Sequence, residues 1–129
     1  RFNPRYGLII VRAVLTGPIR RVRVRLALDT GASATLVSAA ILVAARYRPS
    51  SSRHSVEITT SSGIEFVPVV RANSMTALGR RVRDLPVVAH TLPPSTGVDG
   101  LIGLDFMRER VLEVDFVSGF VSLRKPRRE

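Results

Sequence analysis

The amino-acid sequence predicts an all-β domain, either a closed barrel or a sandwich of seven or eight short strands, with two short helices. Valine, isoleucine and threonine supply 33 of the 129 residues, and β-branched side chains fit a pleated sheet. Several short segments alternate apolar and polar residues, which is the period of a strand with one buried face. The length corresponds to one domain, and no linker is visible, so we expect residues 1–129 to form a single domain.

The first two strands are expected to form a hairpin. Residues 7–15 are apolar and β-branched, residues 19–28 alternate strictly, and Thr16-Gly17-Pro18 between them favours a turn. In the second strand the apolar side chains share one face, and three arginines share the other: Arg21, Arg23 and Arg25. We interpret this arginine stripe as a solvent face, and an anion-binding stripe is the alternative.

The middle of the chain predicts a short strand, a helix and two hairpins. Ser38 is placed to cap a helix over residues 39–46. A hairpin of residues 56–60 and 64–70 has a small polar tip, Ser61-Ser62-Gly63. The other expected elements are a strand at 35–37 and a hairpin of 75–78 with 82–89.

The last quarter of the chain predicts a loop, a short helix and a final hairpin. Residues 90–97 are rich in proline and read as a loop. Residues 98–103 lead into a helix near Asp105 to Arg110. The final hairpin joins residues 111–117 and 120–123 around Ser118-Gly119.

Arginine dominates the charge. Twenty basic residues stand against ten acidic ones, for a net charge of +10, and nineteen of the twenty are arginine. Such a balance makes polyanions plausible partners, although the arginines can equally solvate a small domain. A nucleic-acid-binding barrel would need the arginine stripe to face one groove, and its binding would depend steeply on salt.

Several classes of protein are disfavoured by what the sequence lacks. Without cysteine there is no disulfide, no thiolate metal site and no cysteine nucleophile. No run of about 20 apolar residues is present, so no membrane span is expected. The N-terminus has no signal-like apolar block, and cytoplasmic localisation is the default expectation.

The strongest candidate for chemistry is Asp29-Thr30-Gly31, directly after an apolar strand. A carboxylate at the end of a buried strand is costly to desolvate, so it needs a partner or a purpose. Thr30 offers a hydroxyl beside it, and Gly31 permits a tight turn. Ser33 is placed to donate a hydrogen bond back to this loop.

Rival sites are weaker. Residues 31–35 nearly match a serine-hydrolase elbow but lack its final glycine. His54 and His90 are isolated in the sequence. Asp99 and Asp105 lack metal-ligand spacing, and Asp105 is expected to cap the short helix. No metal and no cofactor are expected.

Two segments taken in order carry a family resemblance. Residues 26–33 read LALDTGAS, and residues 98–107 read VDGLIGLDFM. With the closing hairpin of 112–116 and 120–123, the chain resembles the retropepsin-like aspartic proteases over about residues 7–124. The resemblance implies a small closed β barrel of the retropepsin type that acts as a homodimeric aspartic endopeptidase on peptide or protein substrates.

The resemblance also implies residue roles. Asp29, Thr30 and Gly31 would form the catalytic loop, with the two copies of Asp29 holding a water and Thr30 bonding across the dimer. The flap over the substrate falls on about residues 57–67, and Leu101 and Ile102 would pack behind the catalytic loop and help line the site. The implied substrate-binding residues are Ala32, Thr60, Ser61, Ser62, Gly63, Leu101 and Ile102.

Two features bear on this interpretation. Amide hydrolysis by acid–base catalysis needs two carboxylates, and this chain has one Asp-Thr-Gly turn, so the second must come from another copy. Viral members usually carry an Asp–Arg pair where Ser33 and Leu104 stand, and both are changed here.

The alternative function is a catalytically silent retropepsin fold that serves as a dimerisation or polyanion-binding module.

Overall fold

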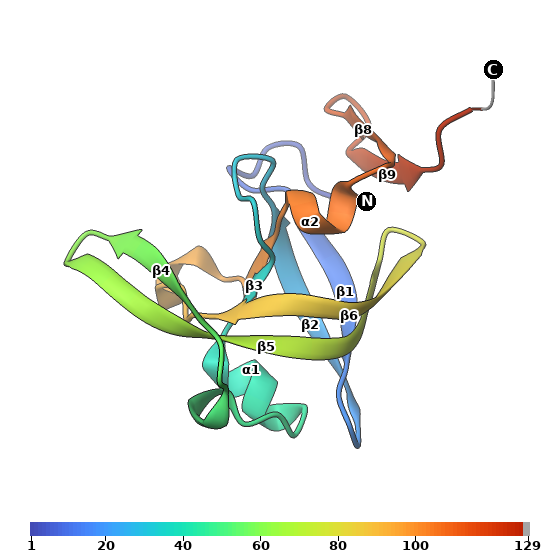
Figure 1. Cartoon of the computed structure of the whole chain (residues 1–129). Helices are drawn as coiled ribbons and strands as arrows, with labels where there is room; N and C mark the ends of the chain where they lie inside the picture. The colour runs from blue at the N-terminus through green and yellow to red at the C-terminus, as the bar shows by residue number, and fades with distance from the viewer. Residues whose placement is uncertain (128–129) are drawn as a thin grey trace.

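The computed structural model describes residues 1–127, and its centre is a closed barrel of six strands (Figure 1). Neighbouring strands around the ring are β1 (Ile10–Thr16), β2 (Arg21–Leu28), β7 (Gly100–Ile102), β3 (Leu36–Val37), β6 (Arg80–Ala89) and β5 (Gly63–Ala77). Antiparallel pairing of β5 with β1 closes the ring. The expected barrel is confirmed, and the sandwich alternative is wrong.

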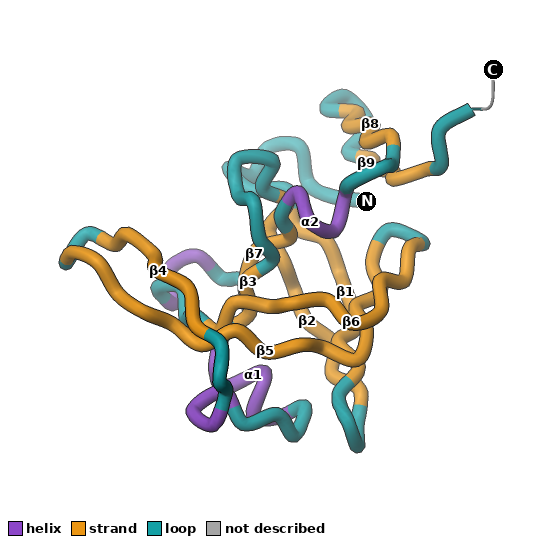
Figure 2. Tube along the Cα trace, in the orientation of Figure 1, coloured by secondary structure: helices purple, strands orange, loops and turns teal. Residues whose placement is uncertain are grey.

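The other elements lie around this barrel (Figure 2). β4 (Ser55–Thr60) pairs with the first half of β5 and extends the sheet beyond the ring. β8 (Val111–Asp115) and β9 (Phe120–Arg124) form a separate two-stranded sheet near the C-terminus. The helical elements are α1 (Ala39–Ala44), α2 (Leu104–Met107) and two 3₁₀ turns at Pro49–Ser51 and Pro94–Thr96.

The helices keep their predicted places with shorter bounds. The Ser38 side chain accepts a hydrogen bond from the Ile41 N–H, so the predicted cap of α1 is confirmed. α2 begins one residue before the expected Asp105 and ends three residues before Arg110. Arg108 already has extended backbone angles and Glu109 has a φ of 63°, which no α-helix accommodates.

β5 corrects the prediction of two separate strands. It runs for 15 residues without interruption and pairs with β4, then with β6, and near its end with β1 as well. The polar residues in the segment 71–74 suggest the end of a strand in the sequence. In the structure β6 pairs with β5 on both sides of this segment, so the strand continues through it. Ser74 and Met75 are both buried, so the buried side chains shift here from even-numbered to odd-numbered positions.

The barrel interior is filled by apolar side chains from almost every strand. Leu15, Leu26 and Ile102 are fully buried, and Phe106 from α2 closes the cluster at one end. Along β2 the apolar residues face this core and the arginines face out, as the alternation predicted. None of the helices among residues 1–127 combines the length and apolar character that a membrane crossing requires.

Candidate active site

The loop that carries Asp29 begins where β2 leaves the barrel. The Asp29 N–H donates to the Ile102 carbonyl at 3.0 Å, which extends the parallel pairing of β2 with β7 by one residue. The Gly31 N–H donates to the Asp29 carboxylate at 2.9 Å, and the Ala32 N–H donates to the Asp29 carbonyl at 3.2 Å. Asp29 is half-buried. Its carboxylate is therefore oriented by the backbone of its own loop while part of it remains open to solvent.

The second segment of the sequence pattern holds this loop from behind. β7 lies between β2, which runs parallel to it, and β3, which runs antiparallel. After β7, the Leu104 N–H donates to the Ala32 carbonyl at 2.8 Å, and the Asp105 N–H donates to the Ser33 carbonyl at 3.3 Å. Two segments about seventy residues apart thus form one interlocked unit.

Two glycines allow the segments to approach so closely. A Cβ added at Gly103 would lie 2.7 Å from the Ala34 carbonyl, and one at Gly100 would lie 1.9 Å from the Leu36 carbonyl oxygen. Both contacts are with backbone atoms, which cannot rotate away. These positions need glycine for space, because neither has a positive φ.

A buried hydroxyl joins the two segments, and the sequence analysis missed it. Thr35 is fully buried; its hydroxyl donates to Asp105 Oδ1 at 2.7 Å and accepts from the Gly103 N–H at 3.2 Å. The Thr35 N–H donates to Asp105 Oδ2 at 3.0 Å. The prediction that Asp105 caps the helix is wrong, since the N-cap position is Gly103 and no side chain caps it. The feature of the sequence that could have revealed this contact is the single hydroxyl residue, Thr35, directly before the short apolar strand β3.

Backbone contacts at Ser33 and Leu104 join the Asp29 loop to the segment after β7. Ser33 is exposed, and within residues 1–127 its hydroxyl makes no hydrogen bond, so the expected bond back to the loop is wrong. Its carbonyl makes the contact instead. The Leu104 side chain is 40% exposed and is apolar.

Asp99 has a structural role at the start of β7. Its carboxylate accepts from the Arg25 N–H at 2.8 Å, and its own N–H donates to the Arg25 carbonyl at 2.7 Å. The Asp99 carbonyl accepts from the Ser38 N–H at 2.8 Å. Within residues 1–127 no three His, Cys, Asp or Glu side chains come close enough to hold a metal ion.

The hairpin of β4 and β5 projects away from the barrel, as Figure 1 shows at the left of the view. Its turn is Ser61-Ser62, between the paired residues Thr60 and Gly63. The Thr60 hydroxyl donates to the Gly63 carbonyl at 3.1 Å and accepts from the Ser62 N–H at 3.2 Å. The Thr60 hydroxyl thus bridges the two ends of the turn.

A groove separates this tip from the loop that follows β6. Its walls are formed by Thr59 to Ser62 and Glu65 on one side and by His90 to Pro94 on the other. His90, which is isolated in the sequence, is therefore placed beside the tip. No residue of the Asp29 loop lines this groove. This groove therefore belongs to the tip and to the loop after β6, and not to Asp29.

The predicted site residues fall into three environments. Thr30 and Gly31 are exposed at the end of the loop, and Ala32 is half-buried. Leu101 is half-buried, whereas Ile102 is fully buried in the core, so Ile102 backs the loop and has no surface left for a substrate. The structure brings the loop and the Leu101-Ile102 pair together; it leaves the hairpin tip apart from them.

Comparisons with known proteins agree with this geometry. A family model described as "gag-polyprotein putative aspartyl protease" matches residues 15–109. Among solved structures, the chain is similar to a retropepsin-like aspartic protease from Rickettsia conorii, with a TM-score of 0.67 and 17% identity over 86% of this chain and 79% of that one. At this identity the likeness shows the fold. No curated protein matches the chain significantly.

Proposed function

The chain belongs to the aspartyl protease family of gag polyproteins, and we propose that it is an aspartic endopeptidase whose active site forms between two copies. The observation that carries the proposal is the Asp29 loop. Its carboxylate is held by the Gly31 N–H, remains partly open, and sits on an interlocked unit of β2, β3 and β7. A rigid support of this kind is what a reacting carboxylate needs.

Two facing copies of Asp29 supply the chemistry of peptide hydrolysis. Two carboxylates about 3 Å apart cannot both ionise, so they share one proton. The ionised carboxylate removes a proton from a bound water, whose oxygen attacks the carbonyl carbon of the scissile peptide. The protonated carboxyl gives its proton to the carbonyl oxygen. When the tetrahedral intermediate collapses, the C–N bond breaks and the leaving nitrogen takes a proton.

Three features support assembly of two copies. Thr30 and Gly31 are exposed at the end of the loop, where a symmetry axis would bring them to their counterparts. Within one chain, the groove beside the hairpin tip contains no residue of the Asp29 loop. The β8–β9 hairpin exposes Phe120 in β9 and Phe116 and Val117 in the connecting turn, and large apolar side chains gathered on a surface are typical of an interface.

The proposal assigns roles to the predicted residues. Asp29 is catalytic, and Thr30 and Gly31 shape and pair the loop. Ala32, Leu101 and the tip residues Thr60, Ser61, Ser62 and Gly63 contact the peptide substrate, while Ile102 supports the loop from the core. The tip reaches the substrate by closing over it, as flexible hairpins do in other enzymes.

The silent-module alternative predicts the same assembly without cleavage. The single Asp-Thr-Gly turn of each chain is compatible with both functions, because two copies bring two aspartates in either case. The silent module is disfavoured by the oriented Asp29 carboxylate, which a dimerisation module does not need.

The experiment that tests the proposal mixes wild-type chains with Asp29→Asn chains. The variant keeps the shape and removes the ionisable group, so it should dimerise and not cleave a peptide library. After exchange in an equal mixture, random pairing leaves about one quarter of dimers with both aspartates, and activity per wild-type chain falls to about half. Unchanged activity per wild-type chain, with exchange verified by native mass spectrometry, contradicts a shared site. No cleavage by wild-type dimers at any pH supports the silent module.

A further inference from the structure

The outer face of the β1–β2 hairpin collects unpaired arginines. Pairing of the two antiparallel strands puts Arg12 directly opposite Arg25, with Val14 opposite Arg23 and Thr16 opposite Arg21. All four arginines are exposed. Like charges directly opposite each other on a sheet destabilise it, so this arrangement has a cost for the free protein.

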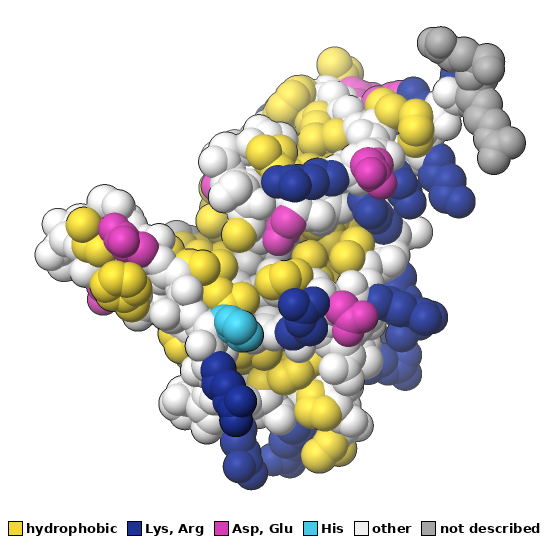
Figure 3. Space-filling view, in the orientation of Figure 1, with side chains coloured by type: hydrophobic (Ala, Val, Ile, Leu, Met, Phe, Trp, Pro, Cys, Tyr) yellow, Lys and Arg dark blue, Asp and Glu magenta, His cyan; other side chains and the backbone are white. Residues whose placement is uncertain are grey.

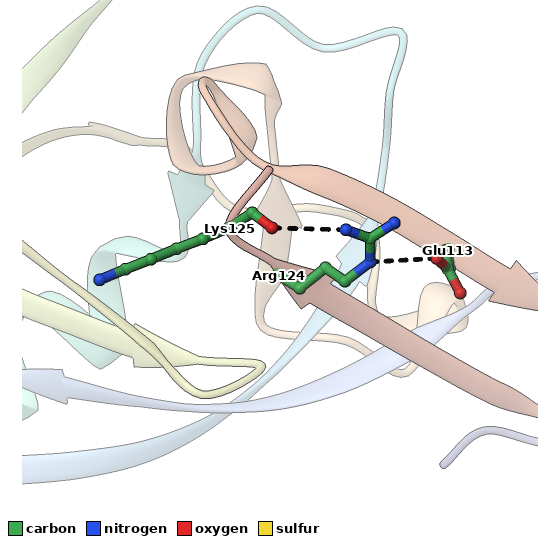
Figure 4. Close-up of polar contacts among 3 residues, drawn as sticks. All are labelled: Glu113, Arg124 and Lys125. Atoms are coloured by element: carbon green, nitrogen blue, oxygen red, sulfur yellow. Dashed lines mark hydrogen bonds and ion pairs between the residues drawn. The ribbon is translucent and has the colours of Figure 1, made fainter. Parts of the chain in front are cut away.

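No acidic side chain compensates these charges. Among residues 1–127 the one ion pair is Arg124 with Glu113 at 3.1 Å, in the separate β8–β9 sheet (Figure 4). Within the same residues, the side chains of Arg12, Arg21, Arg23 and Arg25 make no hydrogen bond either. Lys and Arg side chains, dark blue in Figure 3, gather along the right-hand edge of the face shown there.

Three of these arginines line one groove. Arg12, Arg23 and Arg25, together with Val14 and the strand backbone, line an open hollow of about 470 Å³. Two smaller hollows adjoin it, and both contain Arg25 and Tyr6. The Tyr6 side chain is 63% exposed. The surface thus runs from a row of guanidinium groups to an aromatic ring that packs against little else.

We propose that this arginine groove binds a single-stranded nucleic acid, with its phosphates on Arg12, Arg23 and Arg25 and one base stacked on Tyr6. Guanidinium groups match phosphate oxygens in planar, two-bonded contacts. Along β2, Arg23 and Arg25 are two residues apart, which spaces them by about 6.7 Å and lets successive charges follow one extended backbone. Exposed aromatic rings stack on any base.

The surroundings favour this occupant over two others. A second copy of the chain also carries a net charge of +10, so it would be repelled on average by the arginines of the groove. An acidic peptide would satisfy the arginines and leave Tyr6 without a role. The larger hollow is lined by residues 12–14 and 23–25, and no residue of the Asp29 loop contributes to it.

The test compares two triple variants of the chain of 129 residues. Arg12→Gln, Arg23→Gln and Arg25→Gln remove the groove charges. Arg48→Gln, Arg53→Gln and Arg108→Gln remove three exposed charges elsewhere and lower the net charge equally. Circular dichroism and thermal unfolding verify that both are folded. Binding is measured by fluorescence anisotropy with labelled 20-nucleotide oligouridine and oligothymidine, and with labelled polyglutamate.

We expect the groove variant to lose oligonucleotide affinity at least tenfold, and the control variant to lose much less. Each phosphate contact on a single strand contributes about 0.7 to the steepness of log affinity against log salt. Removing three arginines should therefore make this slope shallower by about 2. Tyr6→Ala should weaken binding about tenfold without changing the slope. Comparing the uridine and thymidine strands shows whether RNA or DNA is preferred.

Two results would overturn the proposal. Equal loss of affinity and slope in both triple variants would mean that diffuse charge alone attracts the oligonucleotide. Tighter, groove-dependent binding of polyglutamate than of either oligonucleotide at the same salt would identify an acidic protein partner. Peptide cleavage should be unaffected by the groove variant, so the outcome is separate from that of the protease proposal.

Discussion

The carboxylate of Asp105 accepts two hydrogen bonds from Thr35, one from its hydroxyl at 2.7 Å and one from its backbone N–H at 3.0 Å. The two residues are seventy positions apart in the chain and come from the two segments that form the Asp29 loop and its support. Because Thr35 is fully buried, water does not compete for these two hydrogen bonds. The two hydrogen bonds therefore fix the chain after the Asp29 loop to the start of α2.

Thr35→Val should destabilise the fold by about 1–3 kcal/mol, because the Gly103 N–H loses its acceptor and Asp105 loses a donor in a buried setting. The free energy of unfolding is measured by urea denaturation. Thr59→Val, at an exposed position of β4, is the matched control and should change it by less than about 0.5 kcal/mol. Equal effects of the two substitutions would show that the Thr35 contact carries no special stability.

Gly100→Ala should destabilise by about 3 kcal/mol or prevent folding, because the new methyl group would meet the Leu36 carbonyl oxygen at 1.9 Å. Gly7→Ala serves as the control, since nothing lies within 4 Å of its added Cβ. Thermal unfolding of both variants checks this. A Gly100→Ala protein as stable as Gly7→Ala would mean that β3 and β7 can separate at little cost.

Stability should fall at alkaline pH through Tyr47. Its hydroxyl donates to the Thr16 carbonyl at 2.8 Å and accepts from the Asn73 N–H at 2.7 Å. Burial raises the pKa of Tyr47, and the Asn73 bond opposes this more weakly. The unfolded chain releases the phenol proton near pH 10 and the folded chain later. The contribution is therefore complete below about pH 10 and is lost as pH rises toward the folded value.

Denaturation series between about pH 9 and 11.5 measure this slope. Tyr47→Phe should remove part of the alkaline decline, whereas Tyr6→Phe, at the other tyrosine of the chain, should leave it unchanged. The same slope in wild type and Tyr47→Phe would contradict the assignment.

Cleavage should follow a bell-shaped dependence on pH, with its maximum in mildly acidic to near-neutral solution. A dyad works with one carboxylate ionised and one protonated, so it fails when both are charged or both neutral. Initial rates on a peptide substrate across pH 3–9 measure the curve. A rate that keeps rising into alkaline solution would point to a different nucleophile.

Local patterns in the sequence were sufficient for much of the fold. Strict alternation in residues 19–28 predicted β2 and placed its arginines outward, and Ser38 predicted the start of α1. The Asp29-Thr30-Gly31 turn also followed from residue types alone. These features depend on neighbours within a few positions, so propensity and period are enough to reveal them.

Closure of the barrel decided the rest. β5 continues as one strand because β6 pairs with it past the polar residues that suggested a break. The Asp105 side chain accepts from Thr35 and does not cap the helix as predicted. Pairing of β1 with β2 brings Arg12 opposite Arg25, and so adds a β1 arginine to the groove that the β2 arginines alone did not predict. The sequence by itself determined which face of each strand is apolar and where the turns lie. The tertiary structure alone decided which polar groups meet, because those partners lie far apart along the chain and are selected by the shear and register of the closed ring.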